Sequence, residues 1–179
     1  QAAQLRHWLS QQNIDHQQLS FIQGDITQPE LGLSPEDWKT LNQVNYLYNT
    51  SALFKWHLSM QQAQAVNVDG LTNLLQSVSK HCHLERAIHL SGYMLTLDQH
   101  LKKAGIYREN IEKTHWSKIY DTLGAYEASK IQGHFNWIKQ ADLLDIPWTV
   151  IHPATVIGDE INGEIPASQP IAALIQQLQ

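Results

Sequence analysis

The fold is decided by residues 60–91, which read MQQAQAVNVDGLTNLLQSVSKHCHLERAIHLS. In the first part of this stretch, apolar residues recur at helical spacing and predict a long helix from Met60 to about His81. A short apolar run then predicts a strand at 86–91. Gly70 lies inside the helix at a cost of about 1 kcal/mol relative to alanine. We therefore expect Gly70 to let a neighbouring backbone or a ligand come close.

The segments on both sides of this stretch repeat the alternation of strand and helix. Apolar runs predict further strands at 19–26, 44–48 and 148–152. Helical patterns and a Ser34-Pro35 start signal predict helices at 1–12, from 34 onward and at 125–141. No tight hairpin signal of the Asn-Gly type separates the strands, so crossover connections must join them. The sequence therefore predicts an α/β fold with an open, doubly wound parallel sheet.

The composition limits the classes of partner. The 179 residues carry 12 Lys and Arg against 17 Asp and Glu, and 42% are hydrophobic, which is enough for a sizeable core. Without a Lys/Arg cluster there is no electrostatic footprint for nucleic acid or an anionic membrane, and no apolar run could span a bilayer. A single cysteine, Cys82, excludes an internal disulfide. These features predict a cytoplasmic protein with neither nucleic-acid nor membrane partners.

Candidate functional side chains follow the predicted strands, since open α/β sheets bind ligands beyond the carboxyl ends of their strands. Asp25 follows the first strand, residues 49–52 follow the second, Ser91 ends the third and Pro153 follows the fourth. If the strands are parallel, all of these residues lie along one edge of the sheet.

Tyr126 and Lys130 form a pair with a definite chemistry. They are four residues apart in GAYEASK, residues 124–130, so a helix places both side chains on one face. A fixed ammonium beside a phenol favours the phenolate, which a tyrosine needs to exchange protons near neutral pH. The Ser91 hydroxyl could hydrogen-bond the same substrate oxygen and stabilise developing charge. Together these groups are typical of carbonyl reduction or alcohol oxidation, although the pair alone is a weak motif.

The order of short motifs along the chain resembles that of the extended short-chain dehydrogenase/reductases. These motifs are Gly24-Asp25-Ile26, Asn67-Val68-Asp69-Gly70, Leu90-Ser91, Tyr126-x-x-Ser129-Lys130 and His152-Pro153-x-x-Val156-x-Gly158-Asp159. Within this family the chain is most similar to the thioester reductase and carboxylate reductase branch. That similarity rests on LYNTSAL at residues 47–53 and on the long separation between Ser91 and Tyr126. The resemblance covers nearly the whole chain and implies a Rossmann-like fold.

The resemblance implies a role for each motif in an NAD(P)-dependent oxidoreductase. Tyr126 would be the proton donor or acceptor, Lys130 would bind the nicotinamide ribose and tune Tyr126, and Ser91 would orient the substrate carbonyl. Asn67 would support the proton relay. The implied contacts to NADP or NAD are Asp25 and Ile26 at the adenine, Thr50, Ser51 and Ala52 at the central portion, Tyr126 and Lys130 themselves, and Pro153 and Val156 at the nicotinamide. The implied substrate is a small-molecule or carrier-bound carbonyl or thioester, and a homodimer formed through helices near Tyr126 is left open.

Three features depart from the family pattern. Gly92-Tyr93 follows Ser91 where a small hydroxyl residue is usual, and Asn49 stands where related reductases often carry His. The sequence also contains no Gly-x-x-Gly-x-x-Gly or Gly-x-Gly-x-x-Gly loop to hold a pyrophosphate. We therefore expect residues 1–179 to be a partial NAD(P)-binding domain, from the second helix of the fold to just beyond the nicotinamide-contacting loop. The resemblance implies that the first βαβ part and most of the C-terminal substrate part are lacking, and that the segment alone binds cofactor poorly.

Other interpretations stay open at this point. An epimerase or dehydratase of the same family would use the same Tyr and Lys, and a non-catalytic NAD(P)-binding homologue would keep only the fold. The ten histidines include no pair at i,i+4 spacing, so we expect no metal site and assign them to solvent or to helix C-termini. The charged cluster within residues 102–113 predicts a solvated surface, with a mobile lid over the substrate as the alternative.

Overall fold

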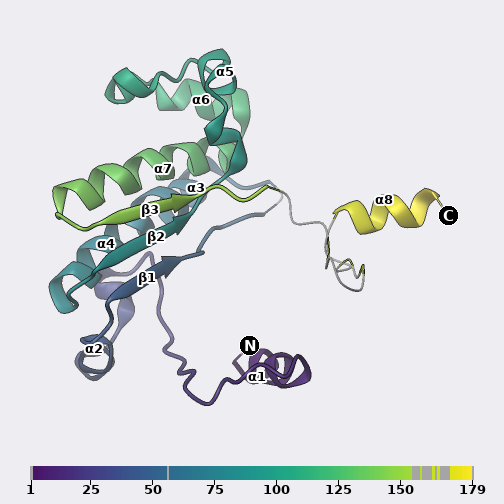
Figure 1. Cartoon of the computed structure of the whole chain (residues 1–179). Coiled ribbons are helices and arrows are strands. Elements are labelled where there is room, and N and C mark those ends of the chain that lie inside the picture. The colour runs from purple at the N-terminus through teal and green to yellow at the C-terminus, as the bar shows by residue number, and fades with distance from the viewer. Residues whose placement is uncertain are drawn as a thin grey trace.

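The computed structural model describes residues 2–55, 57–154, 158, 163, 165 and 170–178. Its sheet has three parallel strands in the order β1-β2-β3, with β1 at Tyr46–Asn49, β2 at Arg86–Leu90 and β3 at Trp148–Ile151 (Figure 1). In the register, Asn49 pairs with His89, and Leu90 pairs with Ile151. The predicted parallel α/β sheet is confirmed, and the carboxyl ends of its strands lie at one edge.

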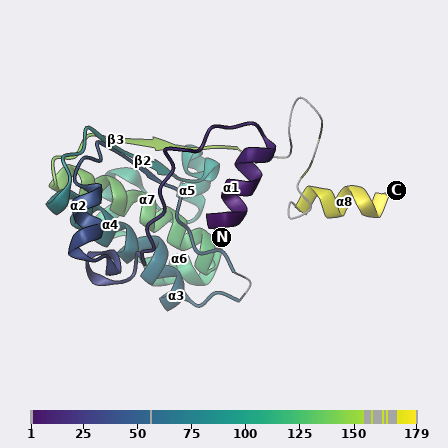
Figure 2. The same cartoon turned by 90° about the horizontal axis from the view of Figure 1, so that it is seen from below.

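The crossover connections are helical, and α4 and α7 lie on the same face of the sheet (Figure 2). Between β1 and β2 run α3 (Met60–Gln64), the π-helical segment η2 (Ala65–Asp69) and α4 (Gly70–His81). Between β2 and β3 run η3 (Tyr93–Thr96), α5 (Asp98–Lys103), η4 (Arg108–Lys113), α6 (Trp116–Leu123) and α7 (Ala125–Leu143). The other described elements are α1 (Ala2–Gln11), η1 (Pro29–Gly32), α2 (Pro35–Leu41) and α8 (Pro170–Leu178). No helix in the described part of the chain is long and apolar enough to cross a membrane.

Two apolar clusters hold these elements together. The first cluster packs α4 and α7 against the sheet, and its largest members include Trp137 and Leu71, each at most 2% exposed. The second cluster packs the segment between β2 and α7 onto the start of α7, and it includes the fully buried Leu101 and Ile106. Because the two clusters share α7, the position of this helix is fixed from both sides.

Local signals set where two of the helices begin. The Ser34 hydroxyl caps α2 by accepting from the Asp37 N–H, and the Asp37 carboxylate accepts from the Ser34 N–H, as the start signal predicts. Helix α7 begins after Gly124, whose φ of 80° and ψ of 163° suit only glycine. This residue ends α6 and lets α7 start in a new direction.

Two glycines allow close packing around the π-helical segment. A Cβ on Gly70 would lie 3.1 Å from Cγ2 of Ile26, so the close neighbour from another segment is a side chain rather than the expected backbone or ligand. A Cβ on Gly133 of α7 would lie only 2.0 Å from the carbonyl oxygen of Asn67. The backbones of α7 and η2 therefore touch at a point where no side chain fits.

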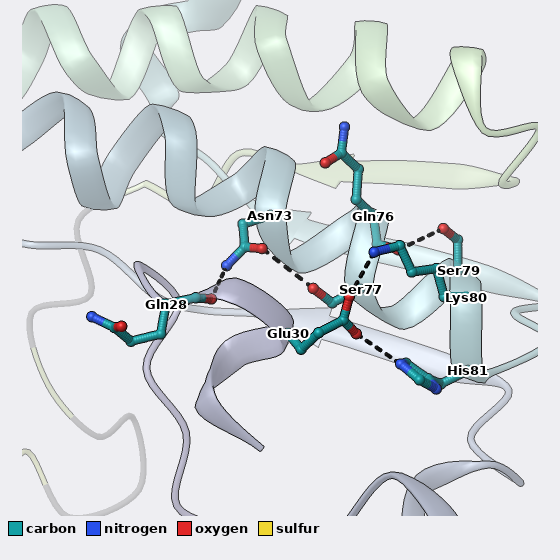
Figure 3. Close-up of polar contacts among 8 residues, drawn as sticks. All are labelled: Gln28, Glu30, Asn73, Gln76, Ser77, Ser79, Lys80 and His81. Carbon is teal, nitrogen blue, oxygen red and sulfur yellow. Dashed lines mark hydrogen bonds and ion pairs between the residues drawn. The ribbon is translucent and has the colours of Figure 1, made fainter. Parts of the chain in front are cut away.

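The strand predicted at 19–26 is wrong. Residues 19–25 run without any strand assignment, because no neighbouring strand in the described residues pairs with their backbone groups. Side chains of α4 hold the following turn instead (Figure 3). Nδ2 of Asn73 donates to the carbonyl oxygens of Ile26 and Gln28, and the Glu30 carboxylate pairs with Lys80 at 2.6 Å. The segment is thus attached to a helix rather than to the sheet.

Candidate functional site

The first candidate site, called here the β2 site, consists of Ser91, Tyr126 and Lys130 at the carboxyl end of β2. Nζ of Lys130 donates to the carbonyl oxygen of Leu90 over 3.3 Å, which places the ammonium next to the backbone of Ser91. Ser91 is 8% exposed, and its Oγ has no hydrogen-bond partner among the described residues. Since a buried hydroxyl without a partner is costly, this oxygen fits a hydrogen bond to a ligand.

Lys130 is a half-buried cation, and its ammonium makes one hydrogen bond to the described residues. Burial of its ammonium lowers the pKa of Lys130 from its ordinary value. An ammonium carries three donors, and the Leu90 carbonyl takes one of them. The remaining donors suit the ribose hydroxyls that the family resemblance assigns to Lys130.

Tyr126 stands in the first turn of α7, one turn before Lys130. Its ring meets the Phe54 ring edge-on, with the centroids 4.7 Å apart, and its side chain is 36% exposed. Phe54 belongs to the segment that follows β1, so this contact joins that segment to α7. The exposure leaves Tyr126 accessible to a ligand at the same edge of the sheet.

Asn67 connects three elements around Tyr126. Its Oδ1 accepts from the Leu53 N–H at 2.7 Å, while its Nδ2 donates to the Leu53 carbonyl oxygen at 3.1 Å and to Oγ of Ser129 at 2.9 Å. The Ser129 hydroxyl in turn donates to the carbonyl oxygen of Tyr126 at 2.9 Å. These bonds hold the segment after β1 and the first turn of α7 against η2, and support of a proton relay by Asn67 stays a prediction.

The second candidate site, called here the β1 pocket, is an open cavity of about 390 Å³ at the carboxyl end of β1. Its lining includes Ile22, Gly24, Asp25, Ile26, Leu47, Tyr48, Asn49, Thr50, Ser51 and Leu74. The structure therefore brings together four of the predicted cofactor contacts from two separate segments, namely Asp25, Ile26, Thr50 and Ser51. The Asp25 carboxylate accepts from the N–H of Thr27 at 2.9 Å and from its Oγ1–H at 2.7 Å. These hydrogen bonds hold the pKa of Asp25 below its ordinary value.

Four further predicted cofactor contacts do not line the β1 pocket, namely Ala52, Pro153 and the two residues of the β2 site, Tyr126 and Lys130. Ala52 is exposed just beyond the lining, and Pro153 is exposed in the coil that follows β3. Val156 lies outside the described residues. A contact of these five residues with the cofactor stays a prediction.

The assignment of the histidines to solvent is wrong for His89 and His134, which are 1% and 3% exposed. Burial, followed by the positive charge of Lys130, lowers the pKa of His89 to about 3. Burial, followed by the neighbouring His152, lowers the pKa of His134 to about 4. The signal was present in the sequence, since His89 stands between apolar strand residues and His134 follows Ile131 by three positions on the inward face of α7.

The charged cluster within residues 102–113 lies on the surface, as expected. Its Lys, Arg and Glu side chains are exposed, and Arg108 pairs with Asp98 at 2.8 Å. Ile106 of the same segment and the preceding Leu101 are buried in the second cluster. The solvated surface is confirmed, and the lid alternative stays a prediction.

Comparison with protein families gives one match along nearly the whole chain. Residues 2–179 match the model of an NAD-binding family described as male sterility protein. Among curated proteins, the chain is 27% identical over 147 residues to the probable polyketide synthase 9/36 of Dictyostelium discoideum, covering 79% of this chain and 5% of that protein. It is 22% identical over 156 residues to the fatty acyl-CoA reductase wat of Drosophila melanogaster, covering 78% of this chain and 30% of that protein. The chain thus spans less than a third of the length of either relative.

Solved structures share the fold at low sequence identity. The terminal R domain of the myxalamid PKS-NRPS pathway has a TM-score of 0.63 at 20% identity, over 86% of this chain and 38% of that domain. The NADPH complex of Gre2 from Candida albicans has a TM-score of 0.63 at 18% identity, over 95% of this chain and 53% of that protein. Both likenesses confirm the Rossmann-like architecture.

Proposed function

The chain belongs to the NAD-binding male sterility protein family, within the extended short-chain dehydrogenase/reductases, and from this premise we propose that it is part of an NAD(P)H-dependent reductase of thioesters. Tyr126 is the proton donor in this proposal, Lys130 binds the nicotinamide ribose, and Ser91 orients the substrate carbonyl. Asp25, Ile26, Thr50 and Ser51 hold the adenosine and central portions of the cofactor in the β1 pocket.

The observation that carries the proposal is that the Oγ of Ser91, which has no partner in the described part of the chain, follows directly on the Leu90 carbonyl that binds the Lys130 ammonium. Ser91 and Lys130 come from different elements, yet the bond from Lys130 to the Leu90 carbonyl joins them at one strand end. A buried hydroxyl donor next to a cation stabilises negative charge on a substrate oxygen. The β1 pocket continues along the same edge of the sheet, where a dinucleotide would extend.

Ser91, Tyr126 and Lys130 have separate roles in the proposed reduction. A reduced nicotinamide, when bound, supplies the hydride. The Ser91 hydroxyl donates a hydrogen bond to the carbonyl oxygen of the substrate, and the Tyr126 hydroxyl gives its proton to that oxygen as negative charge develops there. The Lys130 ammonium stabilises the phenolate that remains on Tyr126.

The choice of thioesters rests on the kinds of relative. One relative is a probable polyketide synthase and the other a fatty acyl-CoA reductase. Both names refer to enzymes of acyl chemistry, and an acyl-CoA is a thioester. We therefore assign this protein a carrier-bound or coenzyme A-bound acyl thioester as substrate. Addition of the hydride to the acyl carbon and of the Tyr126 proton to the carbonyl oxygen gives a hemithioacetal; its C–S bond then breaks as the hydroxyl proton passes to sulfur, which leaves an aldehyde and a free thiol.

Replacing Tyr126 by Phe tests this function. In the full-length protein, Tyr126→Phe should lower the turnover of an acyl-CoA or acyl-pantetheine thioester by about 100-fold or more, because the proton donor is lost. Binding of NADPH or NADH should stay nearly unchanged. Turnover is followed by the loss of reduced-nicotinamide absorbance, and binding by calorimetry.

Tyr46→Phe is the matched control, since Tyr46 lies at the opposite end of β1 and its hydroxyl bonds only Glu85 among the described residues. It should leave turnover unchanged. Full turnover by Tyr126→Phe would exclude the proposed role of Tyr126. Catalysis on a nucleotide sugar without net consumption of cofactor would identify an epimerase instead.

A further inference from the structure

Asn49, which lines the β1 pocket, forms a buried pair with His89. The family resemblance gives this pair no role. Asn49 ends β1, His89 is its register partner in β2, and they are 3% and 1% exposed. Nδ2 of Asn49 lies 2.9 Å from Nδ1 of His89. The other end of the amide faces Ser51, one of the predicted cofactor contacts.

The orientation of the Asn49 amide follows from its bonds to Ser51. The Ser51 backbone N–H can only donate, and it lies 3.1 Å from one end of the amide, so this end must be the oxygen, Oδ1. The Ser51 hydroxyl donates to the same oxygen over 2.6 Å. The amide nitrogen of Asn49 is therefore the atom that faces His89.

The protonation of His89 follows in turn. The amide nitrogen can only donate, so Nδ1 of His89 must accept, and the single ring hydrogen must sit on Nε2. The ring is stacked on Trp137 of α7, with centroids 5.0 Å apart and planes at 24°. Trp137 is fully buried in the helix that carries Tyr126 and Lys130. A continuous set of contacts thus runs from Ser51 through Asn49 and His89 to α7.

We propose that Asn49 and His89 are positioning residues, which hold the cofactor-binding turn at 50–52 in a fixed place relative to the helix that carries Tyr126 and Lys130. The inference rests on the proposed function, because it assumes that Ser51 contacts the cofactor. Asn49 fixes the backbone and the hydroxyl of Ser51 through Oδ1. His89 holds Asn49 only as the neutral Nε2–H tautomer. A hydrogen on Nδ1 would point at a hydrogen of the amide nitrogen, and two donors cannot form a hydrogen bond.

The first test compares three variants of the full-length protein. Asn49→Ala should raise KM for the reduced cofactor about tenfold, with a much smaller change in kcat, because the turn loses its two bonds to Oδ1. Asn49→Asp should return KM most of the way to the wild-type value, since a carboxylate still accepts both bonds from Ser51. Asn136→Ala is the matched control: this amide on α7 donates to the Val68 carbonyl oxygen and to Oγ1 of Thr72, away from the turn at 50–52 and outside the lining of the β1 pocket. It should leave KM unchanged.

The second test reads the tautomer directly and needs no activity. In protein labelled with ¹⁵N-histidine, the His89 resonances, assigned by their loss in His89→Phe, should show the hydrogen on Nε2 in the wild type. In Asn49→Asp the hydrogen should appear on Nδ1, because the carboxylate can only accept. A hydrogen on Nδ1 in the wild type would overturn the inference, as would equal values of KM in Asn49→Ala and Asn136→Ala. A wild type that neither binds nor consumes NAD(P)H would overturn the proposed function and leave the tautomer result standing.

Discussion

The β2 site and the β1 pocket lie at one edge of one sheet, yet they are held in place by different kinds of contact. Around the β2 site, the supporting residues Asn67 and Ser129 are each at most 3% exposed. At the β1 pocket, the Asp25 carboxylate is exposed, and among the described residues it accepts only from Thr27, its own near neighbour. One site is therefore fixed by buried long-range contacts, and the adenosine end of the other by an exposed local turn.

The difference has a physical consequence. A buried polar group that loses its partner costs more free energy than an exposed one, because water cannot replace the lost bond. Changes near the β2 site should therefore lower the stability of the fold along with activity. Changes at the Asp25 turn should alter ligand binding alone.

Acid provides the largest expected effect on stability. His89 and His134 have pKa values lowered to about 3 and about 4, while an unfolded histidine titrates near 6.5. The unfolded chain therefore binds more protons below pH 6.5, and the free energy of unfolding falls as the pH drops toward 4. Each histidine contributes up to about 1.4 kcal/mol per pH unit, or about 5 kcal/mol for both near pH 4.5. Urea unfolding at a series of pH values measures this loss.

Single variants assign the acid loss to the buried histidines. His134→Leu should make the decline between pH 6.5 and 4.5 about half as steep, because one of the two proton uptakes is removed. His83→Gln, at an exposed histidine, should leave the slope unchanged. Equal slopes in the two variants would mean that His134 does not cause the loss of stability in acid.

The contact between α7 and η2 gives the next largest effect. Gly133→Ala would place a methyl group 2.0 Å from the Asn67 carbonyl oxygen, so the two backbones must separate. We expect a loss of about 3 kcal/mol in the free energy of unfolding, measured by urea titration, together with a fall in turnover as Tyr126 moves. Gly92→Ala is the control for stability, because a methyl group there has no heavy atom within 4 Å. If Gly133→Ala were as stable as the wild type, the buried contacts around the β2 site would support the fold no more than the exposed Asp25 turn does.

The parts of the molecule that depend on local spacing were predicted from the sequence. The i,i+4 spacing placed Tyr126 and Lys130 on one face of a helix, and the apolar runs at 44–48, 86–91 and 148–152 became the three strands. Asp25 and Ser51 line the same β1 pocket, although the strand predicted before Asp25 does not exist.

The parts that depend on distant neighbours were not predicted. Residues 19–26 have a strand pattern, but a strand exists only beside another strand, and apolar alternation says nothing about which neighbour is present. The position of His89 between apolar strand residues indicates burial, but the sequence does not show its partners, which are Trp137 by stacking and Asn49 by a hydrogen bond. The π-helical segment at 65–69 was likewise hidden, since its apolar spacing is that of an ordinary helix.

The Asp25 turn gives the smallest expected effect on stability. Asp25→Ala should leave the urea midpoint unchanged, because the carboxylate is exposed and its bonds to Thr27 compete with water. It should nevertheless raise KM for the cofactor about tenfold if the carboxylate contacts the adenosine portion, measured by initial rates in the full-length protein. Asp15→Ala is the matched control, since the Asp15 carboxylate accepts from the N–H of Gln17 at 3.0 Å in the same kind of turn outside the β1 pocket. It should change neither quantity. A fall in the unfolding midpoint of Asp25→Ala alone would show that the turn supports the fold as the buried contacts do, and an unchanged KM would remove Asp25 from the cofactor site.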